Sequence, residues 1–162
     1  MIFDTDDMHD TNHRLDLLWQ LKKANAKFRM TAFAVPGLCT PKFLGNLPDW
    51  IEVASHGWLH GGHDCSDPYE AANWTYEQTL EVIDNLHPRF VHLWKSPGWQ
   101  ISDGTYEALL ERDWMVADQH VNDHRRPISL RVHCNGDGDH VHTHVQDVCG
   151  NGLVETFPYL LE

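Results

Sequence analysis

An α/β fold built on a mostly parallel sheet is the architecture that this sequence predicts, and two patterns carry the prediction. Segments typical of strands alternate with segments typical of helices along the 162 residues. Acidic and histidine side chains also follow the ends of several predicted strands. Parallel strands bring their carboxyl ends to one face, where the active sites of α/β barrels lie. The length, with no linker-like stretch, indicates a single domain over residues 1–162.

The predicted strands are short apolar or alternating runs bounded by turn residues or charge. They cover residues 1–7, 28–35, 50–54, 89–95, 114–117, 128–133 and 140–146. Helices are predicted over residues 13–24, 76–86, 103–112 and 152–162, with a short helix or loop at 41–48. Helices between successive strands are the mark of βαβ units, so the order of elements favours parallel pairing.

The helix starts carry local capping signals. Asn12 is a suitable N-cap for the first helix, on which Leu15, Leu18 and Trp19 share one face. Thr75 and Gln78 form a capping box at the start of the helix predicted over residues 76–86. Ser102 or Asp103 caps the helix predicted over residues 103–112.

Composition excludes several classes of protein. The net charge of -12, with histidine neutral, repels phosphate backbones and argues against a nucleic-acid partner. No apolar run approaches the ~20 residues of a membrane helix. The start, MIFDTDDMHD, has no basic leader and no apolar signal core, so we expect a cytoplasmic protein. The four cysteines form no C-x-x-C pair and are expected to be free thiols, with Cys134 and Cys149 the one pairing worth checking.

Thirteen histidines are the unusual feature of the composition, because histidine is the commonest metal ligand and a common general acid or base. His56 and His60 are four residues apart, a spacing that on a helix places both on one face. Gly57 stands where the H-E-x-x-H proteases have their glutamate base, so that mechanism is excluded. Two adjacent carboxylates, Asp6 and Asp7, repel each other and need a cation if both are buried.

One aspartate and two histidines make a three-ligand set with open positions, as catalytic zinc sites have. The carboxylate of the pair that does not bind the ion could then deprotonate the metal-bound water. Two other segments add candidate groups. In LWKSPGW, residues 93–99, a cation stands beside a tryptophan suited to stacking on a sugar ring. In HVHTHVQD, residues 140–147, alternation places His140, His142 and His144 on one face of a strand, which is poor core material.

These segments, TDD, SHGWLH, KSPGW and HTH, occur in the order of the signature motifs of the polysaccharide deacetylase (NodB-homology) family, carbohydrate esterase family 4. The resemblance spans residues 3 to about 147. It implies a distorted (β/α) barrel of about seven mostly parallel strands, shortened here because the chain is short for the family. It also implies a metal-dependent hydrolase that removes N-acetyl groups from a GlcNAc-containing saccharide, with metal-bound water, an aspartate base and a histidine acid.

The resemblance assigns a role to each matching residue. Asp6 would be the base, and Asp7, His56 and His60 would hold one divalent ion, zinc foremost, with cobalt, nickel or manganese as alternatives. Further positions complete the site: Pro97 and Trp99 in the substrate groove, His144 or His142 as the acid with His144 favoured, and Asp118 as the residue that orients this histidine.

Two positions depart from the family pattern. Lys95 stands where the family has arginine, which keeps the charge beside Asp6 but loses the bidentate fork. His142 stands where a leucine is usual, which makes the acetyl pocket more polar. The expected partner is a small saccharide or glycan, with no nucleic acid and no membrane. The alternatives are a metal-dependent amidase acting on a non-sugar amide, or a catalytically inactive carbohydrate-binding relative.

Overall fold

The computed structural model describes residues 2–61, 69–119, 130–132, 140–146 and 152–157. In it, seven strands form one sheet in the order β6-β5-β4-β3-β2-β1-β7, and every pair of neighbours is parallel. The strands are β1 (Ile2–Met8), β2 (Met30–Ala34), β3 (Ile51–Ser55), β4 (Phe90–Lys95), β5 (Met115–Gln119), β6 (Leu130–Val132) and β7 (His140–His144). The predicted fold of about seven parallel strands is therefore confirmed.

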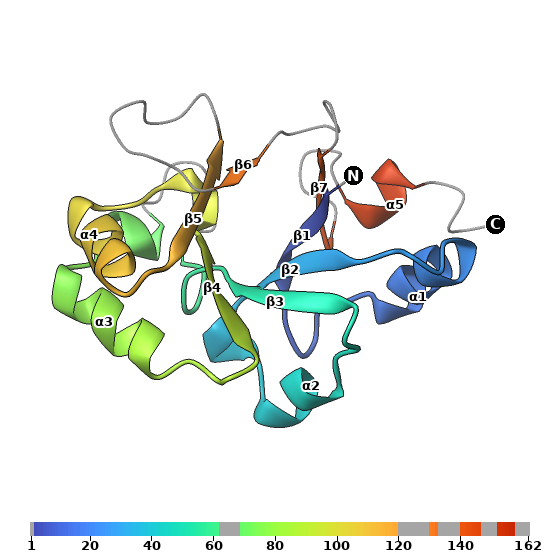
Figure 1. Ribbon diagram of the computed structural model, residues 1–162, viewed down its shortest axis with the longest axis horizontal. Helices are drawn as coiled ribbons and strands as arrows, with labels where there is room; N and C mark the ends of the chain where they lie inside the picture. Colours follow the sequence, from blue (N-terminus) through green and yellow to red (C-terminus); the bar gives the residue numbers. More distant parts are fainter. Residues whose placement is uncertain (1, 62–68, 120–129, 133–139, 147–151, 158–162) are drawn as a thin grey trace.

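The sheet curves round from β6 to β7, and the helices lie on the outer side of the curve (Figure 1). They are α1 (Leu15–Ala24), α2 (Pro41–Asn46), α3 (Tyr76–Asp84), α4 (Asp103–Glu111) and α5 (Leu153–Thr156), with 3₁₀ turns η1 (Pro36–Leu38), η2 (Glu70–Ala72) and η3 (Pro97–Trp99). β6 and β7 follow each other in the chain but form the two edges of the sheet. Over the described residues, the strand order is that of a barrel left open between β6 and β7.

Local sequence signals correctly predict where α3 and α4 begin. The capping box predicted at Thr75 and Gln78 is complete, and the Ser102 hydroxyl accepts a hydrogen bond from the backbone N–H of Thr105. These caps satisfy backbone donors in the first turn that have no partner within the helix. The predicted starts of α3 and α4 are confirmed.

The start of α1 was predicted wrongly. The helix begins at Leu15, after Arg14 in a left-handed conformation, and no side chain caps it. The Asn12 amide is used elsewhere, because it donates to the Asp7 carbonyl at 3.0 Å and to the Gln146 side chain. The buried face also differs, since it comprises Leu17, Leu18 and Leu21, and Trp19 is 45% exposed.

Buried aliphatic and aromatic side chains of the strands pack under the helices. The largest cluster joins Leu17 and Leu18 of α1 to Ile51 and Val53 of β3. In the described parts of the chain, no helix is long and apolar enough to cross a membrane. Cys39 is a free thiol, as expected, while Cys65 and the possible Cys134–Cys149 pair lie outside the described residues.

Candidate metal centre and active site

Asp6 and Asp7 lie near the end of β1, and both are buried. Neighbours on a regular strand face opposite sides, so both can reach one site only if the backbone departs from a regular strand. The structure supplies that departure within the strand. Asp7 has a φ of 64°, and the register between β1 and β2 shifts between Thr5 and Met8. This strand was predicted over residues 1–7, and it continues through the irregularity to Met8.

His56 and His60 lie in the segment that follows β3, and this segment is not helical. The helical interpretation of their spacing is therefore wrong. Left-handed backbone at Gly57 (φ 69°), His60 (φ 75°) and Gly61 (φ 57°) folds the chain back instead. The two imidazole rings lie 5.2 Å apart between centroids. The tight loop therefore brings the His56 and His60 side chains together, as a helix with the same spacing would have done.

Three ligand atoms converge on one point. Asp7 Oδ1 lies 3.2 Å from His60 Nε2 and 3.6 Å from His56 Nε2. Bonds of ~2.0–2.1 Å to a tetrahedral ion place ligand atoms about 3.3–3.4 Å apart, which is close to these separations. Asp7 Oδ1 is also buried without a well-formed hydrogen bond from the described residues. The set Asp7, His56 and His60 therefore fits a divalent metal ion.

The second nitrogen of each imidazole is held by a backbone carbonyl. His56 Nδ1 lies 2.8 Å from the Lys95 oxygen, and His60 Nδ1 lies 3.1 Å from the Gly61 oxygen. A carbonyl can only accept, so each Nδ1 carries a proton, and in the neutral imidazole the lone pair is on Nε2, which faces Asp7. Metal-binding histidines have this arrangement, in which the outer hydrogen bond fixes the tautomer.

The pKa shifts follow from burial and from the Asp7 charge. Burial lowers the pKa of His56, which keeps its imidazole neutral and ready to ligate. Burial also acts to lower the pKa of His60, but contact with Asp7 outweighs it, and the pKa is raised. Burial acts to raise the pKa of Asp7, but the neighbouring histidines outweigh it and hold this pKa well below its usual range.

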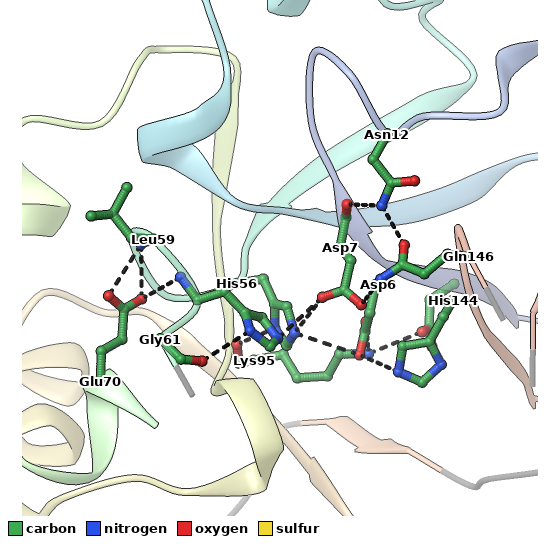
Figure 2. Close-up of polar contacts among 12 residues, drawn as sticks. Asp6, Asp7, Asn12, His56, Leu59, Gly61, Glu70, Lys95, His144 and Gln146 are labelled. Carbon is green, nitrogen blue, oxygen red and sulfur yellow. Dashed lines mark hydrogen bonds and ion pairs between the residues drawn. The ribbon is translucent and has the colours of Figure 1, made fainter. Parts of the chain in front are cut away.

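Glu70 anchors the loop that carries His60, and sequence reasoning did not find it. Its carboxylate accepts hydrogen bonds from the backbone N–H groups of Trp58, Leu59 and His60, at 3.0 Å for the last two. Figure 2 shows the contact with Leu59. Three successive N–H groups pointing at one anion form a backbone nest. Gly57 makes room for the carboxylate, since a Cβ there would meet Glu70 Oε1. The only signal in the sequence was an acidic residue ten positions after His60.

A second polar group restrains Asp7 from the other side. Gln146 Nε2 donates to Asp7 Oδ2 at 3.0 Å, and Asn12 links the Gln146 side chain to the Asp7 carbonyl (Figure 2). The carboxylate is therefore fixed at Oδ2, and Oδ1 remains directed at the histidines. This arrangement also explains why Asn12 does not cap α1.

Lys95 is fully buried at the end of β4, and its ammonium contacts two carboxylates. It forms an ion pair with Asp6 Oδ1, as expected, and a second with Asp4 Oδ1 at 3.0 Å, which the sequence did not predict. Burial acts to lower the pKa of Lys95, but Asp4 and Asp6 outweigh it and raise this pKa. Lys95 thus remains a cation between two buried anions.

His142 and His144 lie beside Asp6, because β7 is the parallel neighbour of β1. Their Nε2 atoms are 3.7 Å and 3.9 Å from Asp6 Oδ2. His142 Nδ1 lies 2.5 Å from Asp4 Oδ1. Burial lowers the pKa of His144. The side chain of His140 lies outside what the structure describes, so its expected place on the same face stays a prediction.

The remaining predicted site residues lie at the ends of β4 and β5. Trp99 is half-buried, its ring edge-on to His142 with 5.8 Å between centroids, and Lys95 Nζ is 5.2 Å from the centre of the Trp99 ring. Pro97 is buried beside Gly57. Asp118 is buried on β5, which is not a neighbour of β7 in the sheet. The groove role of Pro97 and Trp99 and the orienting role of Asp118 stay predictions.

Comparison with known proteins shows a shared fold. A family 4 acetyl xylan esterase from Clostridium thermocellum, solved in complex with a cobalt ion, has a TM-score of 0.62 and 15% identity over 99% of this chain and 80% of that one. The Xyl-CE4 domain of a multidomain xylanase from the hindgut metagenome of Trinervitermes trinervoides has a TM-score of 0.61 and 14% identity over the same shares. No family model and no curated protein sequence matches the chain.

Proposed function

We propose that this protein is a metal-dependent hydrolase that removes N-acetyl groups from a GlcNAc-containing saccharide or glycoconjugate. The observation that carries the proposal is that a candidate metal-binding trio and a further carboxylate lie together in one buried site. Asp7, His56 and His60 form a metal-binding trio, and Asp6 stands next to it as a carboxylate outside that trio. The fold shared with family 4 carbohydrate esterases, one of them solved with cobalt, supports the same conclusion.

Asp7, His56 and His60 would hold the ion, for which zinc is our first choice. When bound, a divalent ion supplies Lewis-acid polarisation of a carbonyl oxygen. Asp6 would accept a proton from the attacking water, because its Oδ2 faces the histidines while Lys95 occupies Oδ1. General base catalysis of this kind contributes about 10²–10⁴-fold to a rate.

The departing nitrogen needs a proton, and the β7 histidines are suited to give it. His144 is the more accessible of the two, with 20% of its side chain exposed against 1% for His142. Burial lowers the pKa of His144, which makes its protonated form a stronger acid. We therefore assign the acid to His144. Trp99, half-buried beside this pair, would support one face of a sugar ring.

Release of acetate from defined substrates tests the proposal. We expect the zinc- or cobalt-loaded protein to release acetate from GlcNAc oligomers, and His60→Ala to release none. Acetylated xylo-oligosaccharides are the second substrate, because the acetyl xylan esterase with the same fold is named for that chemistry. A cyclic amide is the third. Turnover of the xylan ester alone would make the protein an O-deacetylase, and turnover of the cyclic amide alone would make it an amidase.

A further inference from the structure

Asp4 is a buried acid, 1% exposed, that the proposed function does not use. It stands opposite His142 in the register of β1 with β7, so both side chains lie on the same face of the sheet. The closest contact, 2.5 Å, joins Asp4 Oδ1 to His142 Nδ1, and Lys95 Nζ reaches the same oxygen at 3.0 Å. Two groups, one from β7 and one from β4, therefore meet on a single carboxylate oxygen of β1.

The chemistry of these groups fixes where the protons lie. Lys95 can only donate, and an ionised Asp4 can only accept. His142 Nδ1 is 2.5 Å from Asp4 but 3.4 Å from Lys95, so its bonding partner is the carboxylate and Nδ1 carries the proton. His142 Nε2 is then the nitrogen that faces Asp6 Oδ2, at 3.7 Å.

A lysine side chain is flexible and ends in a compact ammonium group, so a single ion pair does not fix the position of that group. Lys95 has the general base, Asp6, on one side and Asp4 on the other. Asp4 is itself fixed by His142. The two bonds to Asp4 would restrain Lys95, and through it the Asp6 carboxylate.

Asp6, His142 and His144 also form a trio that could hold an ion. Charge argues against a second ion at this position. Among the described side chains that meet here, Asp4, Asp6 and Asp7 carry three negative charges and Lys95 carries one positive charge, which leaves -2. One divalent ion at Asp7, His56 and His60 neutralises that charge, and Lys95 already occupies Asp6 Oδ1.

We propose that Asp4 is a positioning residue for the base Asp6, acting through Lys95, and that the Asp4–His142 hydrogen bond holds it in place. The proposal rests on the deacetylase function proposed above. It predicts that Asp4 affects turnover without contacting substrate, and that the chain binds one ion rather than two.

The first test does not depend on activity. Proton NMR of the zinc-loaded protein with ¹⁵N-labelled histidine should show the His142 Nδ1–H resonance well downfield of ordinary imidazole protons, as expected for a short bond to a carboxylate. The signal should be lost in Asp4→Ala and in His142→Ala and should remain in His144→Ala. A wild-type protein without this signal would overturn the proposal.

The second test uses Asp4→Asn, which keeps the shape and removes the charge. We expect kcat to fall about 10- to 100-fold, the usual effect of losing an outer positioning group, with KM and metal content unchanged. The matched control is Asp84→Asn, which removes an exposed ion pair with Arg112 and should leave kcat unchanged. Unchanged kcat in Asp4→Asn, a loss of metal from it, or two ions per wild-type chain would each overturn the proposal. If the wild type releases no acetate while the downfield signal is present, the proposed function fails and the orientation of His142 by Asp4 stands.

Discussion

Asp6 and Asp7 are chemically identical neighbours, but their surroundings differ, and we assign them different roles on that ground. Asp7 has one oxygen directed at His56 and His60, and the other held by Gln146. Asp6 has one oxygen on Lys95, and the other faces the two β7 histidines and, at 3.8 Å, His56 Nε2. The assignment of Asp7 as ligand and Asp6 as base therefore rests on which groups each carboxylate meets.

This assignment predicts two different outcomes for the same substitution. Asp6→Asn keeps the shape of the side chain and removes the base, so we expect full metal content and a loss of activity of about 10²–10⁴-fold. Asp7→Asn removes a ligand charge, so metal and activity should be lost together. Elemental analysis and initial rates on both variants decide the matter. A metal-free Asp6→Asn protein beside a loaded and active Asp7→Asn protein would reverse the two roles.

The proposed metal binding should depend on pH through His60. In the metal-free site, contact with Asp7 raises the pKa of His60 above 6.5, while burial lowers that of His56. Only a neutral imidazole can ligate, so His60 must lose a proton that His56 has already lost. Zinc affinity should therefore fall as the pH is lowered through the raised pKa of His60. Calorimetric titrations from about pH 8 to pH 6 measure this, and a constant affinity over that range would contradict it.

At the scale of single elements, the loop from His56 to Gly61 depends on Glu70. The left-handed residues of this loop favour other conformations in isolation, and the Glu70 carboxylate is what gathers its N–H groups. Two segments that are separate in the sequence thus share one local structure. The geometry of the candidate metal site therefore depends on this pair of segments rather than on the histidine spacing alone.

We predict that Glu70→Ala weakens metal affinity about 10- to 100-fold, as loss of an outer support commonly does, because His60 is no longer held in place. Glu70→Gln keeps an acceptor oxygen and should lie between wild type and Glu70→Ala. Glu77→Ala, an exposed acid on α3, is the matched control and should bind metal normally. Competition with a chromogenic chelator gives the three affinities, and equal values for all of them would refute the role of Glu70.

For the whole molecule, the ion would connect distant parts of the chain. Its ligands come from β1 and from the segment after β3, and the groups behind them come from β4 and from the residues that follow β7. Strands at the open side of the sheet are thus joined through polar contacts to strands at its centre. Binding of metal should stabilise the entire fold rather than one loop.

Removing the ion should therefore lower the melting temperature. A ligand present at 100 times its Kd adds about 2.7 kcal/mol to the free energy of unfolding. For a chain of 162 residues this corresponds to roughly 5–10 °C. Thermal unfolding with zinc and after dialysis against a chelator measures the shift. His60→Ala should melt at the same temperature under both conditions, and an equal shift in that variant would place the ion elsewhere.

The order of strands and helices could be predicted from the sequence, because the signals for it are local. Apolar alternation marks the strands, and Thr75, Gln78 and Ser102 cap helices through contacts within a few residues. The start of α1 was missed because Asn12 bonds to Gln146, 134 residues away, instead of to its own helix.

The sequence by itself determined the element order, the seven-stranded α/β fold and the short list of candidate residues, since motif order and residue type are visible along the chain. Only the tertiary structure decided how those residues are used. The left-handed backbone at Asp7 directs the side chains of both Asp6 and Asp7 into one site. The pairing of β1 with β7 brings Asp4 into contact with His142, 138 residues away. Such contacts depend on which strands become neighbours and on local backbone reversals, and neither is encoded in a spacing that can be read along the chain.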